Sequence, residues 1–141
     1  MAIRDEAAMN ASLDNDYGTT RGPNSPAAHE LALFMGDPMT DGVEVTATND
    51  DGQATGYARA TIAAADWQPA ANGEKSAGAV TFPAATAAYP SSVTHFALIA
   101  GGVTWDCAPL AEELVVTGAG AGPLVQVTLF HADVLDPDEE D

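Results

Sequence analysis

Cysteine is nearly absent from this sequence, which contains a single one, Cys107. A lone cysteine forms no disulfide within the chain, so it does not indicate a redox compartment. Strand alternation would place it beside Val103 and Trp105 on one face, and no basic neighbour is there to lower its pKa. We therefore expect a buried structural thiol.

Basic residues are also scarce: four face 21 acidic residues, for a formal net charge of -17. Such a chain repels phosphate backbones and anionic lipids, so nucleic acid and membrane are not expected partners. The charge fits a solvated surface, or adaptation to high salt, where screening removes self-repulsion. The start of the chain lacks the basic and apolar regions of a signal peptide, and no apolar run is long enough to span a bilayer. We expect a protein that stays in solution.

Metal-binding motifs are missing. The three histidines lie singly on separate predicted strands, without the paired spacing of a zinc site. Residues 37–42 and 49–52 are acidic loops, but neither continues to the glutamate of an EF-hand, and turns between strands explain both. The sequence predicts no metal and no cofactor.

Catalytic motifs are missing as well. No G-x-S-x-G sequence is present, and the glycines of 118–122 lack the lysine and the following helix of a phosphate loop. With so many acids, any carboxylate pair is uninformative about glycoside hydrolysis. We expect that the protein is not an enzyme.

What the sequence does contain is a series of short runs with a period of two. Val43, Val45 and Ala47 form the clearest alternation and are predicted to point inward, and Gly101-Gly102 predicts a hairpin turn. About eight short strands without a helical run between them favour an all-β fold, a β-sandwich or a jelly roll of antiparallel strands. The predicted strands are 29–34, 43–48, 57–63, 79–82, 93–100, 103–107, 113–117 and 124–131.

The N-terminal part follows a different pattern. Residues 3–13 predict a short helix, which would be marginal alone and so needs a surface on which to dock. Residues 18–28 contain Pro23 and Pro26 and predict an extended arm. We therefore divide the chain into a helix and docking arm (1–28), a β-sandwich domain (29–135) and an acidic tail (136–141).

Four residues of the strand region are candidate interface residues. Arg59 shares a predicted strand face with Tyr57, where it forms either a local ion pair, the more expected outcome, or a contact across a subunit interface. Trp67 and Trp105 are either interface anchors or core residues in a chain with few large side chains.

Short segments, taken in their order along the chain, resemble a family of small structural proteins of tailed viruses that infect actinobacteria and haloarchaea. Its members are described as capsid decoration, minor capsid or tail-fibre-like proteins. The resemblance implies a β-sandwich-like domain, homotrimeric or otherwise clustered, on the outside of a protein shell. The segments are Met1-Ala2-Ile3-Arg4-Asp5-Glu6-Ala7, Gly36-Asp37-Pro38, Gly56-Tyr57-Ala58-Arg59, Trp67, Val80-Thr81-Phe82-Pro83 and Val93-Thr94-His95-Phe96-Ala97-Leu98.

From this resemblance we expect a virion structural protein on the outer capsid surface, where it decorates or cements the shell by binding the major capsid protein. Many weak repeated contacts suit such a role. Two alternatives stay open: a tail-fibre or tail-tip protein for host adhesion, and a polysaccharide hydrolase. The lack of an elongated repetitive region favours decoration over a fibre. The predicted docking residues of the arm are Ile3, Arg4, Ala7, Leu13, Tyr17 and Arg21.

Overall fold

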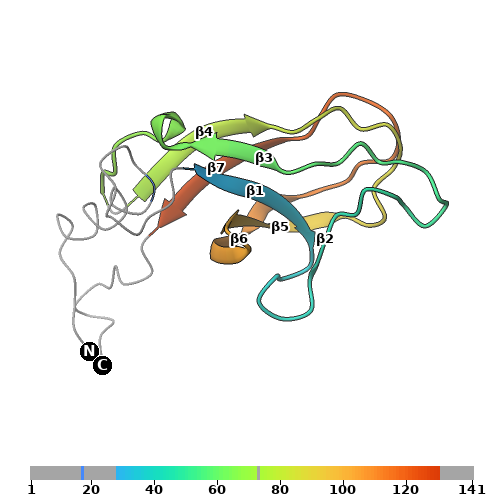
Figure 1. Ribbon diagram of the computed structural model, residues 1–141, viewed down its shortest axis with the longest axis horizontal. Helices are drawn as coiled ribbons and strands as arrows, with labels where there is room; N and C mark the ends of the chain where they lie inside the picture. Colours follow the sequence, from blue (N-terminus) through green and yellow to red (C-terminus); the bar gives the residue numbers. More distant parts are fainter. Residues whose placement is uncertain (1–16, 18–27, 73, 131–141) are drawn as a thin grey trace. The chain divides into compact units, whose positions relative to one another are not determined.

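The computed structural model describes Tyr17, residues 28–72 and residues 74–130. Within these residues the chain is mostly β-structure with one short 3-10 helix (Figure 1). The elements are β1 (Ala28–Met35), β2 (Val43–Glu44), β3 (Ala60–Ala63), η1 (Ala64–Asp66), β4 (Glu74–Thr81), β5 (Val93–Ala100), β6 (Val103–Leu114) and β7 (Leu124–Phe130).

The described chain separates into two compact units. One contains Ile62–Ala79 and the described residues from Gln126 onward, and the other contains His29–Thr61 and Val80–Val125. The strands form two antiparallel sheets, one of five strands in the order β2-β1-β5-β6 with β3 also paired to β1, and one of β4 and β7. For the described residues, the prediction of a mostly β fold with antiparallel strands is confirmed, with seven strands.

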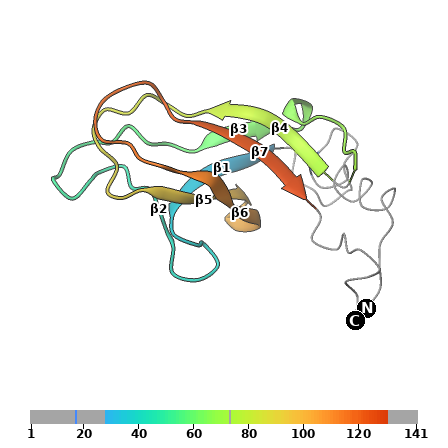
Figure 2. The same ribbon diagram turned by 180° about the vertical axis from the view of Figure 1, so that it is seen from behind.

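The centre of the five-stranded sheet is the pairing of β1 with β5, followed by a hairpin into β6 (Figure 2). The hairpin turns at Gly101 and Gly102, whose φ angles of 59° and 77° lie in the left-handed region that a tight hairpin turn requires. The predicted strand 93–100 and the predicted turn are both confirmed.

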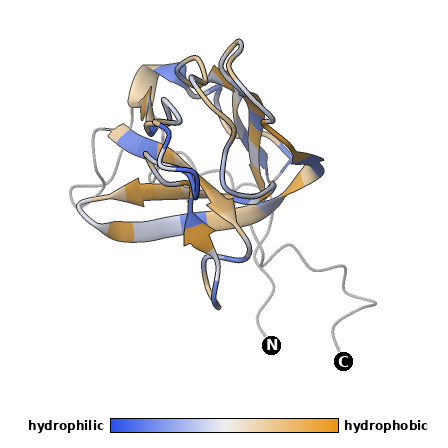
Figure 3. Ribbon diagram, turned by 90° about the vertical axis from the view of Figure 1, so that its right-hand side faces the viewer, coloured by the Kyte–Doolittle hydropathy of each residue, from blue (hydrophilic) through white to orange (hydrophobic). Residues whose placement is uncertain are grey.

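The main core of the unit formed by His29–Thr61 and Val80–Val125 lies on one face of β1 and β5. Leu31 pairs with Leu98 and Leu33 with Phe96, so the four side chains share a face, and all four are buried. Burial of such a side chain contributes roughly 1.5–3 kcal/mol. Figure 3 shows hydrophobic and hydrophilic stretches along the strands. The opposite face carries a smaller cluster of Ala32, Ala97 and Ile99, with Phe34 and Cys107 packed beside it.

Both edges of this sheet are blunted against pairing with another chain. β2 has two residues and β3 has four, so neither presents a long free edge. β6 is twelve residues long but contains Pro109, which donates no hydrogen bond, and an extra residue, Trp105, between the partners of Leu98 and Ile99. Edge-to-edge growth of this sheet is therefore disfavoured.

The second sheet is held by side-chain hydrogen bonds as well as by its strand pairing. Ser76 Oγ on β4 donates to the Val127 carbonyl on β7 (3.1 Å) and accepts from Gly78 N (3.0 Å). Val125 and Val127 are buried at alternate positions of β7, as the period of two predicted. The predicted strand 79–82 begins earlier, at Glu74, because pairing with β7 outweighs the weak strand preference of its alanine and glycine residues.

The prediction for 43–48 is wrong in most of its detail. Only Val43 and Glu44 form a strand, Val43 is 56% exposed, and Ala47 is exposed; Val45 alone is buried as predicted. Beyond Glu44, Thr46 Oγ1 donates to the Thr48 carbonyl (2.6 Å), a local bond that competes with strand pairing.

Two further strand boundaries differ from the prediction. The strand expected from Tyr57 begins only at Ala60; Gly56, just before the expected start, has a φ of 77°, which belongs to a turn rather than to a strand. The segment 113–117 is not a separate strand: β6 continues through Pro109 to Leu114, which is tolerated because β6 is an edge strand.

The predicted N-terminal helix and the acidic tail lie outside the described residues. In the described part, no helix is long and apolar enough to cross a membrane.

Candidate functional site

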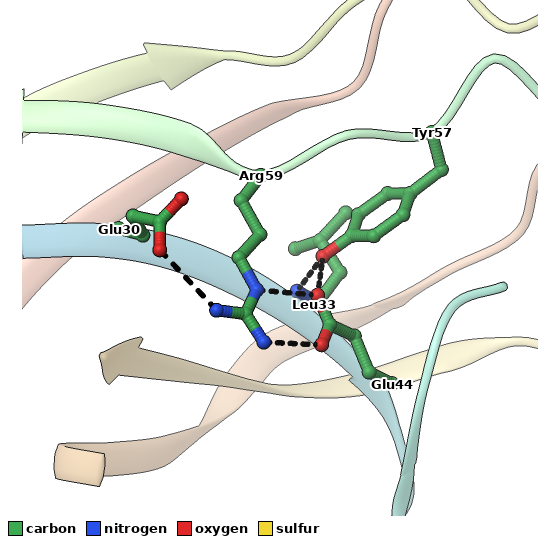
Figure 4. Close-up of polar contacts among 5 residues, drawn as sticks. All are labelled: Glu30, Leu33, Glu44, Tyr57 and Arg59. Carbon is green, nitrogen blue, oxygen red and sulfur yellow. Dashed lines mark hydrogen bonds and ion pairs between the residues drawn. The ribbon is translucent and has the colours of Figure 1, made fainter. Parts of the chain in front are cut away.

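Four charged or polar side chains gather at the edge of β1, and we call them the edge clamp: Glu30, Glu44, Tyr57 and Arg59 (Figure 4). Glu30 lies on β1 and Glu44 on β2, while Tyr57 and Arg59 precede β3. Residues two apart in an extended chain point to the same side, so Tyr57 and Arg59 reach the same partner.

Arg59 holds two strands through its guanidinium group. Its Nε and Nη2 donate to the two carboxylate oxygens of Glu44, at 2.9 Å and 2.8 Å, and its Nη1 lies 3.3 Å from Glu30 Oε1. The two parallel bonds to Glu44 are the stronger, bidentate arrangement of an arginine and a carboxylate. The local ion pair, the more expected outcome for Arg59, is confirmed.

Tyr57 links β2 to β1 through its hydroxyl group. Its hydroxyl donates to Glu44 Oε2 (2.7 Å) and accepts a hydrogen bond from the backbone N–H of Leu33 on β1 (3.0 Å). Its ring stacks on Phe82, with centroids 6.2 Å apart, and meets Tyr89 edge-on at 6.1 Å. Tyr57 therefore joins the core to the charged edge.

The contacts of the edge clamp set its protonation. Burial favours the neutral form of Glu44, but hydrogen bonds from Arg59 and Tyr57 outweigh burial and lower its pKa. Burial, and then the hydrogen bond to Glu44, raise the pKa of Tyr57. The hydrogen bond to Glu44 raises the pKa of Arg59 in spite of partial burial. Tyr57 is thus neutral and Arg59 charged at neutral pH.

This arrangement stabilises the fold and is not prepared for a reaction. Both oxygens of Glu44 accept hydrogen bonds, and the Tyr57 hydroxyl both donates and accepts one. In residues 28–72 and 74–130, no group of three or more His, Cys, Asp or Glu residues is placed to hold a metal ion.

The two tryptophans lie in packed environments. Trp67 is only 6% exposed and contacts the ring of Tyr17, with centroids 4.9 Å apart. Trp105 is half-buried and meets His29 edge-on at 5.3 Å. The interface role of these residues, like that of Tyr57 and Arg59, stays a prediction.

Of the predicted docking residues, only Tyr17 is described, and it is buried against Trp67. Its capsid-docking role is untested. The others, Ile3, Arg4, Ala7, Leu13 and Arg21, lie outside the described residues.

Cys107 is only half-buried, whereas the sequence predicts a buried structural thiol. Burial raises its pKa, and the nearby carboxylates of Asp37 and Asp106 raise it further, so the reactive thiolate is disfavoured. Its predicted companion Val103 is instead 60% exposed. The extra residue in β6 reverses the alternation between these two positions.

The sequence predicts a turn between β1 and β2. We call residues 36–42, which connect the two strands, together with Val43 at the start of β2 (36–43) the tip loop. The Asp37 carbonyl accepts hydrogen bonds from Thr40 N (3.1 Å), Gly42 N (2.8 Å) and Thr40 Oγ1 (3.2 Å). Asp37 Oδ1 accepts from Met39 N (2.9 Å). Met39, at the tip, is 69% exposed.

The closed shape of the tip loop has a signal in the sequence, namely its two glycines. Gly36 has a φ of 110°, and a Cβ on Gly42 would lie 2.4 Å from the carbonyl carbon and oxygen of Gly36. Two glycines that flank an aspartate-proline pair are typical of such a closed loop. The exposure of Met39 has no comparable signal, because an apolar residue in a turn does not reveal which way it points.

The family model described as "Podophage GP4 fiber I protein gp80" matches residues 6–118 of this chain. The matched range covers β1 through β6, and with them the edge clamp and the tip loop. None of the curated proteins compared with the chain matches it.

Proposed function

The chain belongs to the family of the podophage GP4 fiber I protein gp80, and from this premise we propose that it mediates host adhesion as part of a tail fibre. As a member of this family it is a structural component of a phage virion, in the tail fibre, and not an enzyme. The expected class of virion structural protein is thereby confirmed. Its capsid position is not, since the match favours the tail-fibre alternative.

The observation that carries the proposal is the extent of the match, which covers every strand of the five-stranded sheet. The absence of a repeat argues only against a chain that forms a whole fibre shaft by itself. A chain of short strands joined by exposed loops suits a single segment of a fibre, with its loops available to a host surface.

Three finer points belong to the same proposal. We propose a homotrimer, in which three copies present the same loops and gain affinity from multivalent attachment. The arm, residues 1–28, would attach the chain to another virion protein. The sandwich or jelly-roll arrangement of the two sheets is also a proposal.

Capsid decoration remains the second candidate, favoured by the strongly acidic composition of the chain. Its partner would be the major capsid protein. The two functions differ in copy number: a decorated shell needs hundreds of copies per particle, roughly ten times or more what a fibre needs.

Adsorption competition tests the proposal. Purified full-length chain, added to host cells before the phage, should slow adsorption in a concentration-dependent way by occupying the receptors. The same chain after heat unfolding is the control. Unchanged adsorption at saturating chain, together with a copy number in the hundreds per virion, would overturn the proposal in favour of decoration.

A further inference from the structure

We propose that the tip loop is the host-contacting surface of this chain, and that Met39 inserts into an apolar pocket of a host surface protein whose rim is basic. The inference rests on the proposed adhesion function and deepens it by naming the contact and the class of partner.

The first support is that the tip loop is already ordered before it binds. Four hydrogen bonds close it around Asp37, and the backbones of Gly36 and Gly42 touch at its neck. Its base is tied to β5, because Gly36 N donates to Thr94 Oγ1 (3.0 Å). A loop held in one conformation loses little entropy on binding, so its contacts contribute more fully to affinity.

The second support is the apolar surface that this loop displays. Met39 is the most exposed of the large hydrophobic side chains in the described part of the chain. Val43, at the end of the loop, is 56% exposed and pairs with Met35, so a second apolar surface adjoins the neck. Figure 1 shows the loop extending away from β1 and β2. Methionine suits such a contact because its flexible thioether adapts to the shape of a pocket.

The third support concerns the charge of the partner. Asp41 is exposed beside Met39, on a chain with a formal charge of -17. A partner with a basic rim is attracted to such a surface and guided to it. A second copy of this chain does not fit: it has four basic residues, of which Lys75 is buried and Arg59 is held by two glutamates. The apolar tip also fits a protein pocket better than a polar glycan.

Binding of the fluorescently labelled full-length chain to intact host cells tests the inference. The variants are Met39→Ser, Met39→Leu as the conservative replacement, and Asp41→Asn. Val115→Ser is the matched control, because Val115 is 61% exposed and lies outside the tip loop. Each variant is first checked for wild-type circular dichroism and melting temperature, so that a loss of binding is not a loss of folding.

The expected results differ for each change. Met39→Ser should raise the half-saturating concentration about tenfold or more, as removal of a central anchor does, while Met39→Leu restores most of the binding. Val115→Ser should stay within about twofold of the wild type. Asp41→Asn should weaken the decline in binding between about 0.05 M and 0.5 M NaCl. Protease treatment of the cells should abolish binding.

The contrary outcomes separate the two levels of the proposal. If the wild-type chain does not bind host cells, the adhesion function fails and the inference fails with it. If it binds but Met39→Ser binds equally well, or Val115→Ser loses as much, the tip loop is not the contact and adhesion by another surface stands. Binding that survives protease treatment overturns the protein partner.

Discussion

The edge clamp and the tip loop both depend on β1 and β2, yet they are built in opposite ways. The clamp satisfies its charges within the chain: Glu44 accepts from Arg59 and Tyr57, and Glu30 pairs with Arg59. The tip loop satisfies its backbone groups through Asp37 but leaves Met39 69% exposed. The charged cluster therefore has its polar groups satisfied within the chain, whereas the loop displays an exposed apolar side chain.

The comparison shows how little the type of a residue reveals about its role. An arginine and a tyrosine next to each other are typical of an interface. In this chain their polar groups are occupied by Glu44, Glu30 and the N–H of Leu33. A side chain is available to a partner when its own fold leaves it exposed and with few packing contacts, and here that side chain is a methionine in a turn.

Replacement of Tyr57 by alanine should give the largest effect on stability. It removes an aromatic ring that contacts Phe82 and Tyr89, which costs roughly 3–5 kcal/mol. Tyr57→Phe keeps the ring and leaves Glu44 and the N–H of Leu33 without the hydroxyl, at about 1–3 kcal/mol. Urea unfolding measures both. If Tyr57→Phe is as stable as the wild type, the hydroxyl does not hold the edge.

Gly42→Ala should have the next largest effect on stability, and it changes the tip loop rather than the edge clamp. Its Cβ would overlap the backbone of Gly36, so the neck of the tip loop must open, at about 1–3 kcal/mol. Gly52→Ala is the control, since nothing lies within 4 Å of its added Cβ, although its φ of 79° also imposes some strain. A Gly42→Ala chain that melts at the wild-type temperature and keeps its amide chemical shifts in residues 36–43 would show that the loop is not closed in this way.

Glu44→Gln should destabilise the fold by about 1 kcal/mol at pH 7, a modest value because both side chains of the ion pair are partly exposed. The folded-state pKa of Glu44 lies below its usual value of 4.5, so its stabilisation is complete above that pH and is lost as the pH falls through the folded pKa. Urea unfolding from pH 7 to 3 should therefore show the difference between wild type and variant shrinking in acid. A constant difference would contradict the ionic role of Glu44; Glu112→Gln, at an exposed position of β6, is the control.

Met39→Ser should have the smallest effect on stability, within about 0.5 kcal/mol of the wild type, because an exposed side chain loses few contacts. Together with a loss of host-cell binding, this would separate the two regions: the clamp changes stability, and the tip changes binding. A large loss of stability in Met39→Ser would mean that the exposed methionine supports the fold.

Much of the fold was predictable where local pattern and pairing agree. β5 was predicted to the residue from its run of Val, Phe, Leu and Ile, and the hairpin from Gly101-Gly102. The strand prediction for 43–48 failed because Thr46 forms a local hydrogen bond to the Thr48 carbonyl. The start of β4 was predicted too late because the length of this strand is set by its pairing with β7. Neither effect is visible in the alternation of apolar residues.

The role of the site was less accessible to sequence reasoning. The local pairing of Arg59 followed from the abundance of acids, but its partners depend on which strands adjoin β1. Exposure of Met39 depends on the closure of the loop at Gly36 and Gly42. The choice between shell and fibre had no residue to decide it, since neither role needs a reaction, and the family match was required.

The most direct test of the central claim is a cryo-EM map of the intact virion. The account predicts density for this chain at the tail, in a few symmetry-related copies, with residues 36–43 pointing away from the particle. Copies arrayed on the capsid lattice, with none at the tail, would contradict it and restore the decoration hypothesis.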